Sequence, residues 1–501
     1  MQLSAYDVDP ASHDEMFEPG PLVRPEYREL AQRLSEMTSA DIEQRKRLAD
    51  LLLRNLGVTF TVYSDNAGIE KVFPFDPIPR LITASDWETI EKGLVQRVQA
   101  LNLFLHDVYG EQKILNDGVV DPALVYEASG FRREMIGMLA PRGIYTHIVG
   151  TDLIRDERGR FVVLEDNVRS PSGASYVLEC REVLKRVFRV LFERYGVRPI
   201  DDYGDWLREA LLHVAPRTAD EPTIVLLSPG MYNSAYFEHS LLARRMGVTL
   251  VEGRDLCVTD GAVWMRTTQG LKRVDVIYRR IDDDYLDPVV FRPDSMLGCA
   301  GLFSAYRSGA VALANAPGTG VADDKAIYPF VPDMIRYYLD EEPILENVRT
   351  YIASRPDDKK YILENLANLC IKQTDASGGY GMLIGTQSTA EQREEFRRRI
   401  EANPRSYIAQ PVIKLGRHPT LIDDKLEGRC VDLRPYVLVG EKVRVIPGGL
   451  TRVALRRGSL VVNSSQGGGY KDTWVLAGNP GAEAAGNPGA EAAGSPGAEA
   501  G

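Results

Sequence analysis

The spacing of apolar residues divides the chain into helical and strand-rich stretches. Residues 40–57 carry apolar side chains at helical spacing and stop at a glycine, and residues 87–109 have the pattern of one long amphipathic helix. A further helix is predicted for residues 176–195. From residue 223 onward, short apolar segments alternate with a helical segment that runs through residue 243. This alternation predicts βαβ units with a parallel sheet, within a fold of mixed α/β class.

A β-hairpin with polar residues on one face is predicted from the segment TDLIRDERGRFVVLEDNVRSPSG. A turn centred on residues 156–159 pairs Asp152 with Val163. Because side chains alternate between the two faces of a strand, Asp152, Glu165 and Asn167 then point the same way. Two carboxylates and an amide oxygen suit Mg²⁺, a hard cation that substrate phosphates also hold. A solvated acidic face is the alternative interpretation, and the polar loop that follows the hairpin favours a site.

A second segment, LCIKQTDASGGYGMLIG, combines an apolar strand with a loop of small residues. Lys372 lies on the strand, and the glycines Gly378, Gly379 and Gly381 follow in the loop. Glycines let backbone amides approach phosphate oxygens closely, and a strand lysine supplies a point charge for them. No Gly-Lys-Ser/Thr follows the glycines, so the loop is not a P-loop. A Gly-rich hairpin turn without a ligand is an equally open alternative.

Polar residues at the ends of the predicted parallel strands are candidate substrate ligands, because ligands bind outside the carboxyl ends of such strands. Ser228 ends the first strand, and the doublet Arg279 and Arg280 ends the strand VDVIYRR. Two arginines at a strand end can clamp a carboxylate or a phosphate through paired hydrogen bonds. A salt-bridge network with the aspartates at positions 282–284 is the alternative. For Asn315, a turn residue that satisfies the backbone is favoured over a ligand.

Composition narrows the function classes. At 501 residues with 44% hydrophobic content, the chain is long enough for two or three packed domains. A formal net charge of −11 argues against general binding to nucleic acid or to anionic membranes. No apolar run reaches the roughly 18 residues that span a bilayer, and the polar, acidic N-terminus does not resemble a signal peptide. These features predict a cytoplasmic protein.

Scattered cysteines and a repetitive tail are the remaining sequence features. The five cysteines form no CxxC pair and lie in or beside apolar segments, which predicts buried reduced thiols rather than disulfides or zinc ligands. Residues 477–501 repeat an eight-residue unit, AGNPGAEA or AGSPGAEA, without large apolar side chains. Such a segment cannot bury enough surface to offset its chain entropy, so we predict a disordered tail.

These motifs resemble the parts of the ATP-grasp fold in a changed order. A strand lysine with a Gly-rich loop, an adenine hinge at residues 406–414, and an Asp followed by Glu-x-Asn on a hairpin are all present. Here the metal hairpin comes first, so the chain resembles the circularly permuted ATP-grasp type 2 family, which is related to glutathionylspermidine synthase. Three further blocks agree with that family over residues 1–476: FDPIPR at 75–80, LVQRVQALNLFLHDVYG at 94–110 and NSSQGGGYKDTWVL at 463–476.

The resemblance implies a circularly permuted ATP-grasp fold with a βαβ pre-ATP-grasp domain. Residues 1–216 would hold an N-terminal helical region and the permuted segment with the metal hairpin, at about residues 145–175. Residues 217–317 would form the pre-ATP-grasp-like α/β domain. Residues 318–476 would form the nucleotide-binding segment, followed by the disordered tail at 477–501.

The resemblance also implies ATP and Mg²⁺ as cofactors. Asp152, Glu165 and Asn167 match the family's metal-binding residues. Arg169 matches an arginine that faces the acyl phosphate, and Arg434 resembles an arginine near the γ-phosphate. A surface strand arginine is the alternative for Arg434.

Nucleotide contacts follow from the same resemblance. Lys372 and Lys325, the latter within GVADDKAIY, match lysines on the nucleotide phosphates. An ordinary charge pair at a helix start is the alternative for Lys325. Gln410 and Val412 would meet the adenine, chiefly through backbone groups.

The implied activity is that of an ATP-dependent carboxylate–amine ligase, which forms an amide or peptide bond through an acyl phosphate. Its substrates would be a small-molecule or peptide carboxylate and an amine. Two alternatives stay open: a phosphotransferase on the same fold, and a nucleotide-binding scaffold without turnover that works through a protein partner. The intact set of Asp152, Glu165, Asn167 and Lys372 argues against the scaffold.

Overall fold

The computed structural model describes residues 6–20, 22–64, 67–72, 74–216, 221–376, 381–423, 425–462 and 468–478. Several sequence predictions fall outside these ranges. They are the loop glycines Gly378 and Gly379, the part of the tail beyond residue 478 for which disorder was predicted, and the stretch 463–467 of the last family block.

Among the residues that the structure describes, three larger sheets and several small ones form the strand framework. A five-stranded sheet has the order β13-β5-β4-β20-β21, with β4 at Ile148–Arg155, β5 at Phe161–Asn167, β13 at Glu346–Asn347, β20 at Tyr436–Val439 and β21 at Val443–Val445. A four-stranded sheet has the order β14-β17-β15-β16, with β14 at Tyr351–Ile352, β15 at Leu369–Gln373, β16 at Leu383–Ile384 and β17 at Tyr407–Pro411. A second four-stranded sheet has the order β12-β11-β6-β7, with β6 at Ile224–Leu227, β7 at Thr249–Val251, β11 at Val276–Arg279 and β12 at Ala312–Ala314.

The smaller sheets are two- or three-stranded. They comprise β1 (Thr59–Ser64) with β2 (Ala67–Val72), β3 (Arg80–Ile82) with β24 (Thr473–Val475), β8 (Leu256–Thr259) with β9 (Ala262–Thr267) and β10 (Gly270–Val274), β18 (Arg417–Ile422) with β19 (Lys425–Cys430), and β22 (Thr451–Val453) with β23 (Gly469–Lys471).

The α-helices of the described residues include each one predicted from the apolar spacing. They are α1 (Arg28–Glu36), α2 (Ser39–Asn55), α3 (Ala84–Tyr109), α4 (Lys113–Asn116), α5 (Pro122–Tyr126), α6 (Ala174–Val187), α7 (Arg189–Tyr195), α8 (Tyr203–His213), α9 (Tyr236–Met246), α10 (Leu302–Arg307), α11 (Val331–Leu339), α12 (Pro356–Glu364) and α13 (Ala390–Ala402). The predicted helix at 176–195 is two helices, α6 and α7, which meet at Phe188. In the described part of the chain, no helix has the length and apolar character needed to cross a membrane.

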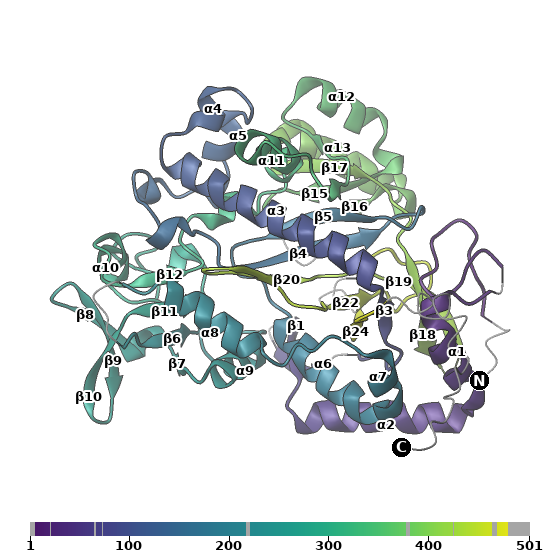
Figure 1. Ribbon diagram of the computed structural model, residues 1–501. Coiled ribbons are helices and arrows are strands. Elements are labelled where there is room, and N and C mark those ends of the chain that lie inside the picture. The colour runs from purple at the N-terminus through teal and green to yellow at the C-terminus, as the bar shows by residue number, and fades with distance from the viewer. Residues whose placement is uncertain are drawn as a thin grey trace, which may run out of the picture.

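The parallel sheet confirms the predicted βαβ alternation. β6 pairs in parallel with β7 and β11, β11 pairs in parallel with β12, and α9 connects β6 to β7. Its strands are short and almost wholly apolar, as strands covered on both faces are. The antiparallel β8-β9-β10 sheet, which projects at the left of Figure 1, was not predicted.

The metal hairpin forms as predicted, but its register differs. Leu153 pairs with Val163, Asp152 pairs with Glu165, and the register shifts between them. The predicted pairing of Asp152 with Val163 is therefore wrong, because Leu164 is an extra residue in a β-bulge. A bulge interrupts the alternation of faces, so that Leu164 and Glu165 both line the same cavity although they are neighbours in sequence.

Helix α3 covers the face of this hairpin that points away from the cavity (Figure 1). Its N-terminus is capped by Thr83, whose side-chain oxygen accepts the Asp86 amide. Within the helix, the buried Arg97 pairs with Asp166 of β5 at 2.7 Å. The hairpin thus turns Asp166 toward α3, and it turns Glu165 and Asn167 toward the cavity.

Candidate active site

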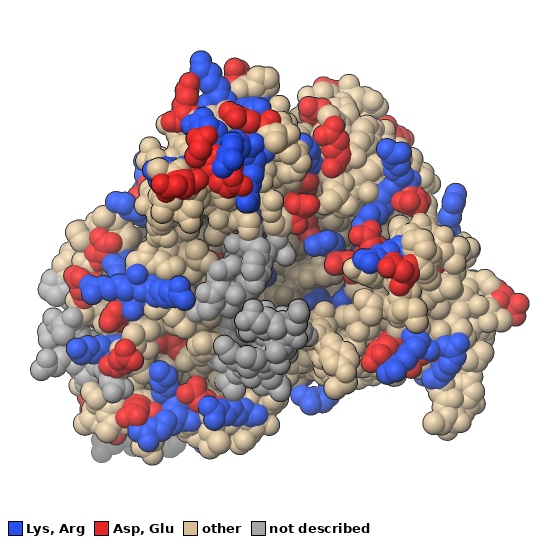
Figure 2. Space-filling model, turned by 180° about the vertical axis from the view of Figure 1, so that it is seen from behind, with Lys and Arg blue, Asp and Glu red and all other residues tan. Residues whose placement is uncertain are grey.

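A cavity of about 490 Å³ lies between the hairpin β4–β5 and the sheet that contains β15 and β17. From behind, the molecule is hollowed near its middle, with basic and acidic side chains on the rim (Figure 2). Nine of the residues proposed from sequence line the cavity: Asp152, Glu165, Asn167, Arg169, Lys325, Lys372, Gln410, Val412 and Arg434. The fold therefore gathers side chains from both ends of the chain into one site.

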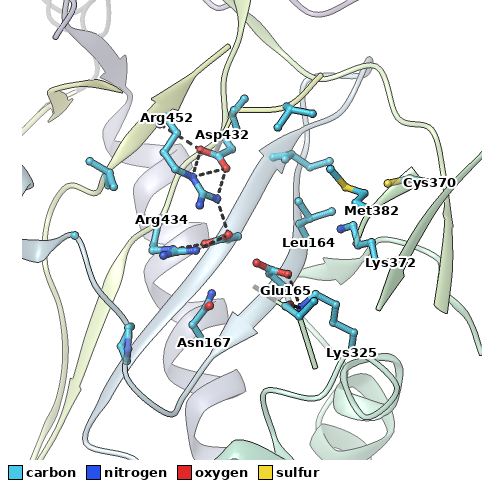
Figure 3. A pocket seen from close by; sticks show the side chains of 18 of the residues that line it. Leu164, Glu165, Asn167, Lys325, Cys370, Lys372, Met382, Asp432, Arg434 and Arg452 are labelled. Carbon is cyan, nitrogen blue, oxygen red and sulfur yellow. Dashed lines mark hydrogen bonds and ion pairs between the residues drawn. The ribbon is translucent and has the colours of Figure 1, made fainter. Parts of the chain in front are cut away.

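Glu165 and Asn167 form the part of the wall suited to a divalent cation (Figure 3). The Glu165 side chain is 24% exposed, and its carboxylate lies 3.5 Å from the Lys325 ammonium. The Asn167 side-chain NH₂ donates to the Gly150 carbonyl at 3.1 Å, which fixes the amide plane. No cluster of three or more His, Cys, Asp or Glu suited to a metal occurs in the described ranges, so phosphate oxygens would have to complete a Mg²⁺ shell here.

Asp152, the third proposed metal ligand, is engaged by two arginines. One of its carboxylate oxygens accepts from Arg434 Nε. The other accepts from Arg434 Nη2 at 2.8 Å and from Arg452 Nη2 at 2.6 Å. Burial alone would raise the pKa of Asp152, but the two guanidiniums hold it well below its usual range.

Arg452 and its partner Asp432 line the same wall and were missed at the sequence level. Arg452 Nε donates to both Asp432 oxygens, at 3.1 and 2.9 Å. The two residues lie on different segments, and an isolated bridge from Val431 to Val453 brings them together. Asp432 lies two positions before Arg434 in the segment VDLRPYVLV, but nothing in the sequence marks it as the partner of Arg452, so only the tertiary structure reveals the pair.

The two proposed phosphate lysines approach the cavity differently. Lys325 donates to the Ala376 carbonyl at 2.7 Å and faces Glu165, so its ammonium already has partners. Lys372 on β15 lines the cavity, and its ammonium makes no hydrogen bond or ion pair within the described ranges. Gly381 has φ +67°, and a Cβ there would lie 2.2 Å from the Gln373 side-chain oxygen. The left-handed backbone therefore favours glycine at the end of this loop, whereas the contact with Gln373 involves the end of a flexible side chain that can shift.

The proposed adenine hinge contains a buried side-chain acceptor that has no hydrogen-bond partner among the described residues. Gln410 is 3% exposed, and its Nε2 donates to the Thr350 hydroxyl at 3.0 Å. Its Oε1 is buried without a hydrogen-bond partner in the described structure. The Val412 N–H, by contrast, already donates to the Asn368 carbonyl at 3.3 Å. Apolar side chains complete this end of the cavity: Ile154, Leu164, Val348, Met382 and Ile413.

The segment GVADDKAIY ties the hairpin exit loop to the nucleotide side. The Asp323 carboxylate accepts the Val168 and Arg169 amides, and it lies 3.5 Å from the Arg169 guanidinium. Burial raises the pKa of Asp323 to about 6 in spite of that arginine. Asp324 instead pairs with Arg405 at 2.8 Å. Arg169 therefore reaches the cavity with Asp323 and, at 3.6 Å, Asp282 as neighbours.

The proposed substrate residues of the parallel sheet lie outside the cavity lining. Arg279 donates to three backbone carbonyls and pairs with Asp283 at 2.6 Å, which realises the salt-bridge alternative. Arg280 donates to the Pro171 carbonyl at 2.7 Å and pairs with Glu238 at 2.8 Å. Ser228 is fully buried and shares a hydrogen bond with a histidine ring at 2.9 Å. These contacts give the three residues internal partners rather than a surface on which to hold a ligand.

Asn315 connects the hairpin to the parallel sheet. Its side-chain oxygen accepts the His147 and Ile148 amides at 2.6 and 2.9 Å, and its NH₂ donates to the Ile148 and Val168 carbonyls at 2.8 and 2.7 Å. The expectation of a backbone-satisfying role is confirmed.

All five cysteines are free thiols, as predicted. Cys180 and Cys299 are buried, whereas Cys257, Cys370 and Cys430 are partly exposed, so the prediction of burial holds for two of the five. Cys370 lines the cavity beside Lys372 (Figure 3).

Fold and cavity together define an ATP-grasp protein. The chain belongs to the circularly permuted ATP-grasp type 2 family, whose model matches residues 79–454. Membership of this family makes the protein an ATP-grasp ligase, but the match does not identify its substrates. The relation to glutathionylspermidine synthase within the family stays a prediction.

Relatives and a solved structure agree with the family. The chain is 55% identical over 480 residues to an uncharacterized protein of Synechocystis sp., which covers 96% of this chain and 100% of that protein. It is 42% identical over 470 residues to a Frankia casuarinae protein provisionally named glutamate–cysteine ligase 2-2, which covers 93% of this chain and 54% of that protein. A glutathione synthetase-like effector of Globodera pallida has the same fold, with a TM-score of 0.56, 10% identity, and coverage of 88% of this chain and 98% of that one.

Proposed function

We propose that this ATP-grasp ligase joins a carboxylate to an amine and forms an amide or peptide bond through an acyl phosphate. The observation that carries the proposal is the composition of one cavity. Lys325 and Lys372 face it from one side, Glu165 and Asn167 from another, and Arg169 and two further arginines complete its polar end. This is the set of charges that phosphoryl transfer to a carboxylate requires.

ATP would lie with its base on the apolar end of the cavity. The adenine amino group would donate to the Gln410 Oε1, the buried acceptor that has no partner in the described structure. The phosphates would then extend toward Lys372 and Lys325. The Val412 N–H already donates to the Asn368 carbonyl, so it is not available to the adenine. The Gln410 side chain would therefore contribute more to adenine binding than it would in a hinge that uses backbone groups alone.

Mg²⁺ would be held by Glu165, Asn167 and Asp152 together with the phosphates, and it would neutralise charge on the transferring group. The γ-phosphoryl group moves to a carboxylate oxygen of the substrate, and ADP leaves. Arg169 and Arg434 hold the oxygens of the acyl phosphate. The amine nitrogen then attacks the acyl carbon, the C–O bond to phosphate breaks, and the departing phosphate takes up the proton that the amine loses, so no side-chain nucleophile is needed.

Amino-acid carboxylates are the first substrates to test. The Frankia relative carries a glutamate–cysteine ligase name, and the polar end of the cavity offers arginines that suit a carboxylate. We therefore place glutamate first among small-molecule and peptide carboxylates, with amino acids and other primary amines as acceptors.

Thermal unfolding with and without Mg-ATP is the first experiment. A ligand at about 100 times its dissociation constant adds roughly 2.7 kcal/mol to native stability. We expect a Mg²⁺-dependent rise in Tm for the wild type that is lost in Glu165→Ala and Lys372→Ala. Glu157→Ala is the matched control, because this exposed glutamate lies in the turn of the same hairpin. The absence of any shift at millimolar ATP would contradict the nucleotide site.

Product analysis separates the ligase from its alternatives. With a carboxylate substrate, ATP and hydroxylamine, an acyl phosphate yields a hydroxamate together with ADP. A phosphotransferase would give a phosphorylated hydroxyl compound and no hydroxamate, and a scaffold would give no ADP.

A further inference from the structure

Two carboxylates and two guanidiniums form a closed cluster on the polar wall of the cavity (Figure 3). Asp152 and Asp432 each have a side chain that is 1% exposed, and those of Arg434 and Arg452 are 12% and 9% exposed. Formal charges balance within the cluster. Buried charges of this kind persist only where each has partners, so any change at one member must be compensated at another.

The two arginines are held unequally. Arg452 has two carboxylate partners, because it pairs with Asp432 as well as with Asp152. Arg434 has a single carboxylate partner among the described residues, Asp152, to which it donates through Nε and Nη2. If Asp152 is taken away, Arg452 keeps an anion and Arg434 keeps none.

The position of Asp152 places it beside the candidate metal ligands. It lies directly opposite Glu165 in the β4–β5 ladder, and both side chains line the cavity with Asn167. Directly opposed side chains of an antiparallel pair lie on the same face, roughly 5 Å apart at Cβ. A cation on Glu165 and Asn167 therefore competes with Arg434 for the same carboxylate.

We propose that Asp152 is an exchange position, which holds Arg434 before Mg-ATP enters and joins Glu165 and Asn167 on the cation afterwards. The exchange releases the Arg434 guanidinium to the phosphate oxygens, while Arg452 stays on Asp432. This inference rests on the proposed Mg-ATP site. Its consequence is that Arg434 reaches the phosphates only when the metal arrives with them, so the protein discriminates against ATP without metal.

The test measures ATP affinity by calorimetry, once with Mg²⁺ and once in EDTA. In Asp152→Asn, Arg434 loses its anion and is available at all times, so affinity for metal-free ATP should rise about tenfold over wild type, as one charge-assisted hydrogen bond provides. Asp432→Asn is the matched control, since it also removes a buried carboxylate from the same wall but leaves Arg434 on Asp152. It should change metal-free ATP affinity far less.

A double variant and a conservative variant exclude simpler explanations. Asp152→Asn/Arg434→Gln has the formal charge of the wild type, and it should return metal-free ATP affinity to the wild-type level. Arg434→Lys keeps the charge but replaces a two-point contact with one, so the Mg²⁺ concentration needed for half-maximal ATP binding should fall. That measurement decides the question even if Asp152→Asn does not fold.

Three results would overturn the exchange. They are equal gains in Asp152→Asn and Asp432→Asn, retention of the gain in the double variant, and an unchanged or higher Mg²⁺ requirement in Arg434→Lys. Each leaves the proposed function intact provided that wild type binds Mg-ATP. A wild type that does not bind Mg-ATP removes both proposals together.

Discussion

The cavity wall and the end of the parallel sheet carry the same kinds of residues in opposite states. On the wall, Glu165 and Lys372 face the cavity with few or no protein partners. At the sheet end, the Arg279 and Arg280 side chains are buried, and their guanidiniums are engaged by carbonyls and carboxylates. Glu165 and Lys372 therefore have hydrogen-bonding groups left for a ligand, whereas those of Arg279 and Arg280 are used within the protein.

Pairing alone does not separate the two regions, because Arg434 is paired with Asp152 and still lines the cavity. What distinguishes Arg280 is that it lies outside the cavity lining, where it joins the parallel sheet to the hairpin exit loop, and we call this contact the joint. A buried charge persists only if its hydrogen-bonding groups are satisfied, so an arginine surrounded by carbonyls has nothing left for a substrate. Arg280 illustrates the joint: it ties the Pro171 carbonyl of the hairpin exit loop to Glu238 on α9. Glu238 in turn accepts the Gly173 and Ser175 amides at the start of α6. The joint therefore positions the floor of the cavity.

Removing the joint should give the largest effect on stability. Arg280→Ala leaves Glu238 buried without its cation, which costs about 3–5 kcal/mol when one partner of a buried pair is removed. The measurement is the free energy of unfolding in urea. Arg292→Ala is the control, because its ion pair with Asp294 in the same region is exposed, and it should change stability little. A small loss in Arg280→Ala would show that the sheet end is not a structural joint.

Removing a cavity lysine should have the opposite signature. Lys372→Ala should lower ATP turnover by about 10²–10³-fold, as loss of one preorganised charge does, because the ammonium is aimed at the phosphates. Its unfolding midpoint should match wild type, since the ammonium has no partner in the described ranges. Lys325→Ala serves as the contrast: it should lose stability as well as turnover, because Lys325 also holds the Ala376 carbonyl. ADP release and thermal unfolding give the two readouts, and equal destabilisation in both variants would contradict the distinction.

Local patterns in the sequence predicted much of this arrangement. The helices α2 and α3 and the strands β6, β7 and β11 follow from apolar spacing, because each pattern is read within one segment, whereas β12 was not predicted. The metal face also followed from strand alternation, although the bulge at Leu164 changed the register. That error came from the hairpin itself, since no residue type marks a bulge of this kind.

Which charged side chains are already paired within the protein could not be predicted, because their partners lie far away in the chain. Asp152 and Arg434 are 282 positions apart, and Arg452 is 300 positions from Asp152. Nothing near Arg280 in sequence indicates that Glu238 will occupy it, so the clamp and the salt bridge were equally good interpretations. Only the tertiary structure shows that Arg434 lines the cavity and that Arg280 belongs to the joint.

Acid should destabilise the folded protein through a buried histidine, His147. Burial lowers the pKa of His147 to about 3, so the ring is neutral in the native protein, whereas an unfolded histidine titrates near 6.5. As pH falls below about 6.5 the unfolded chain binds a proton that the native state does not, and the free energy of unfolding falls by about 1.4 kcal/mol per pH unit from this group.

The variant His147→Gln isolates this contribution. Its free energy of unfolding should fall less steeply between pH 6 and 4 than that of wild type, whatever its stability at neutral pH. Urea unfolding at several pH values measures the slope. Because other buried histidines such as His239 stay in both proteins, only the difference between the slopes is informative. Equal slopes would mean that His147 does not titrate differently in the two states.

The smallest expected effect is on ATP affinity, and it tests whether the buried Gln410 Oε1 accepts a hydrogen bond from the adenine. Gln410→Met keeps the volume of the side chain but removes the buried Oε1, so ATP affinity should weaken about fivefold, the equivalent of roughly 1 kcal/mol for one hydrogen bond. Stability should hardly change, because the lost acceptor has no partner in the described structure and the lost donor serves only the Thr350 hydroxyl. Calorimetry with ATP and with tripolyphosphate, which lacks the base, separates the adenine contact from the phosphate contacts. If affinity falls equally for both ligands, Gln410 acts on the shape of the cavity rather than on the base, and the adenine lies elsewhere.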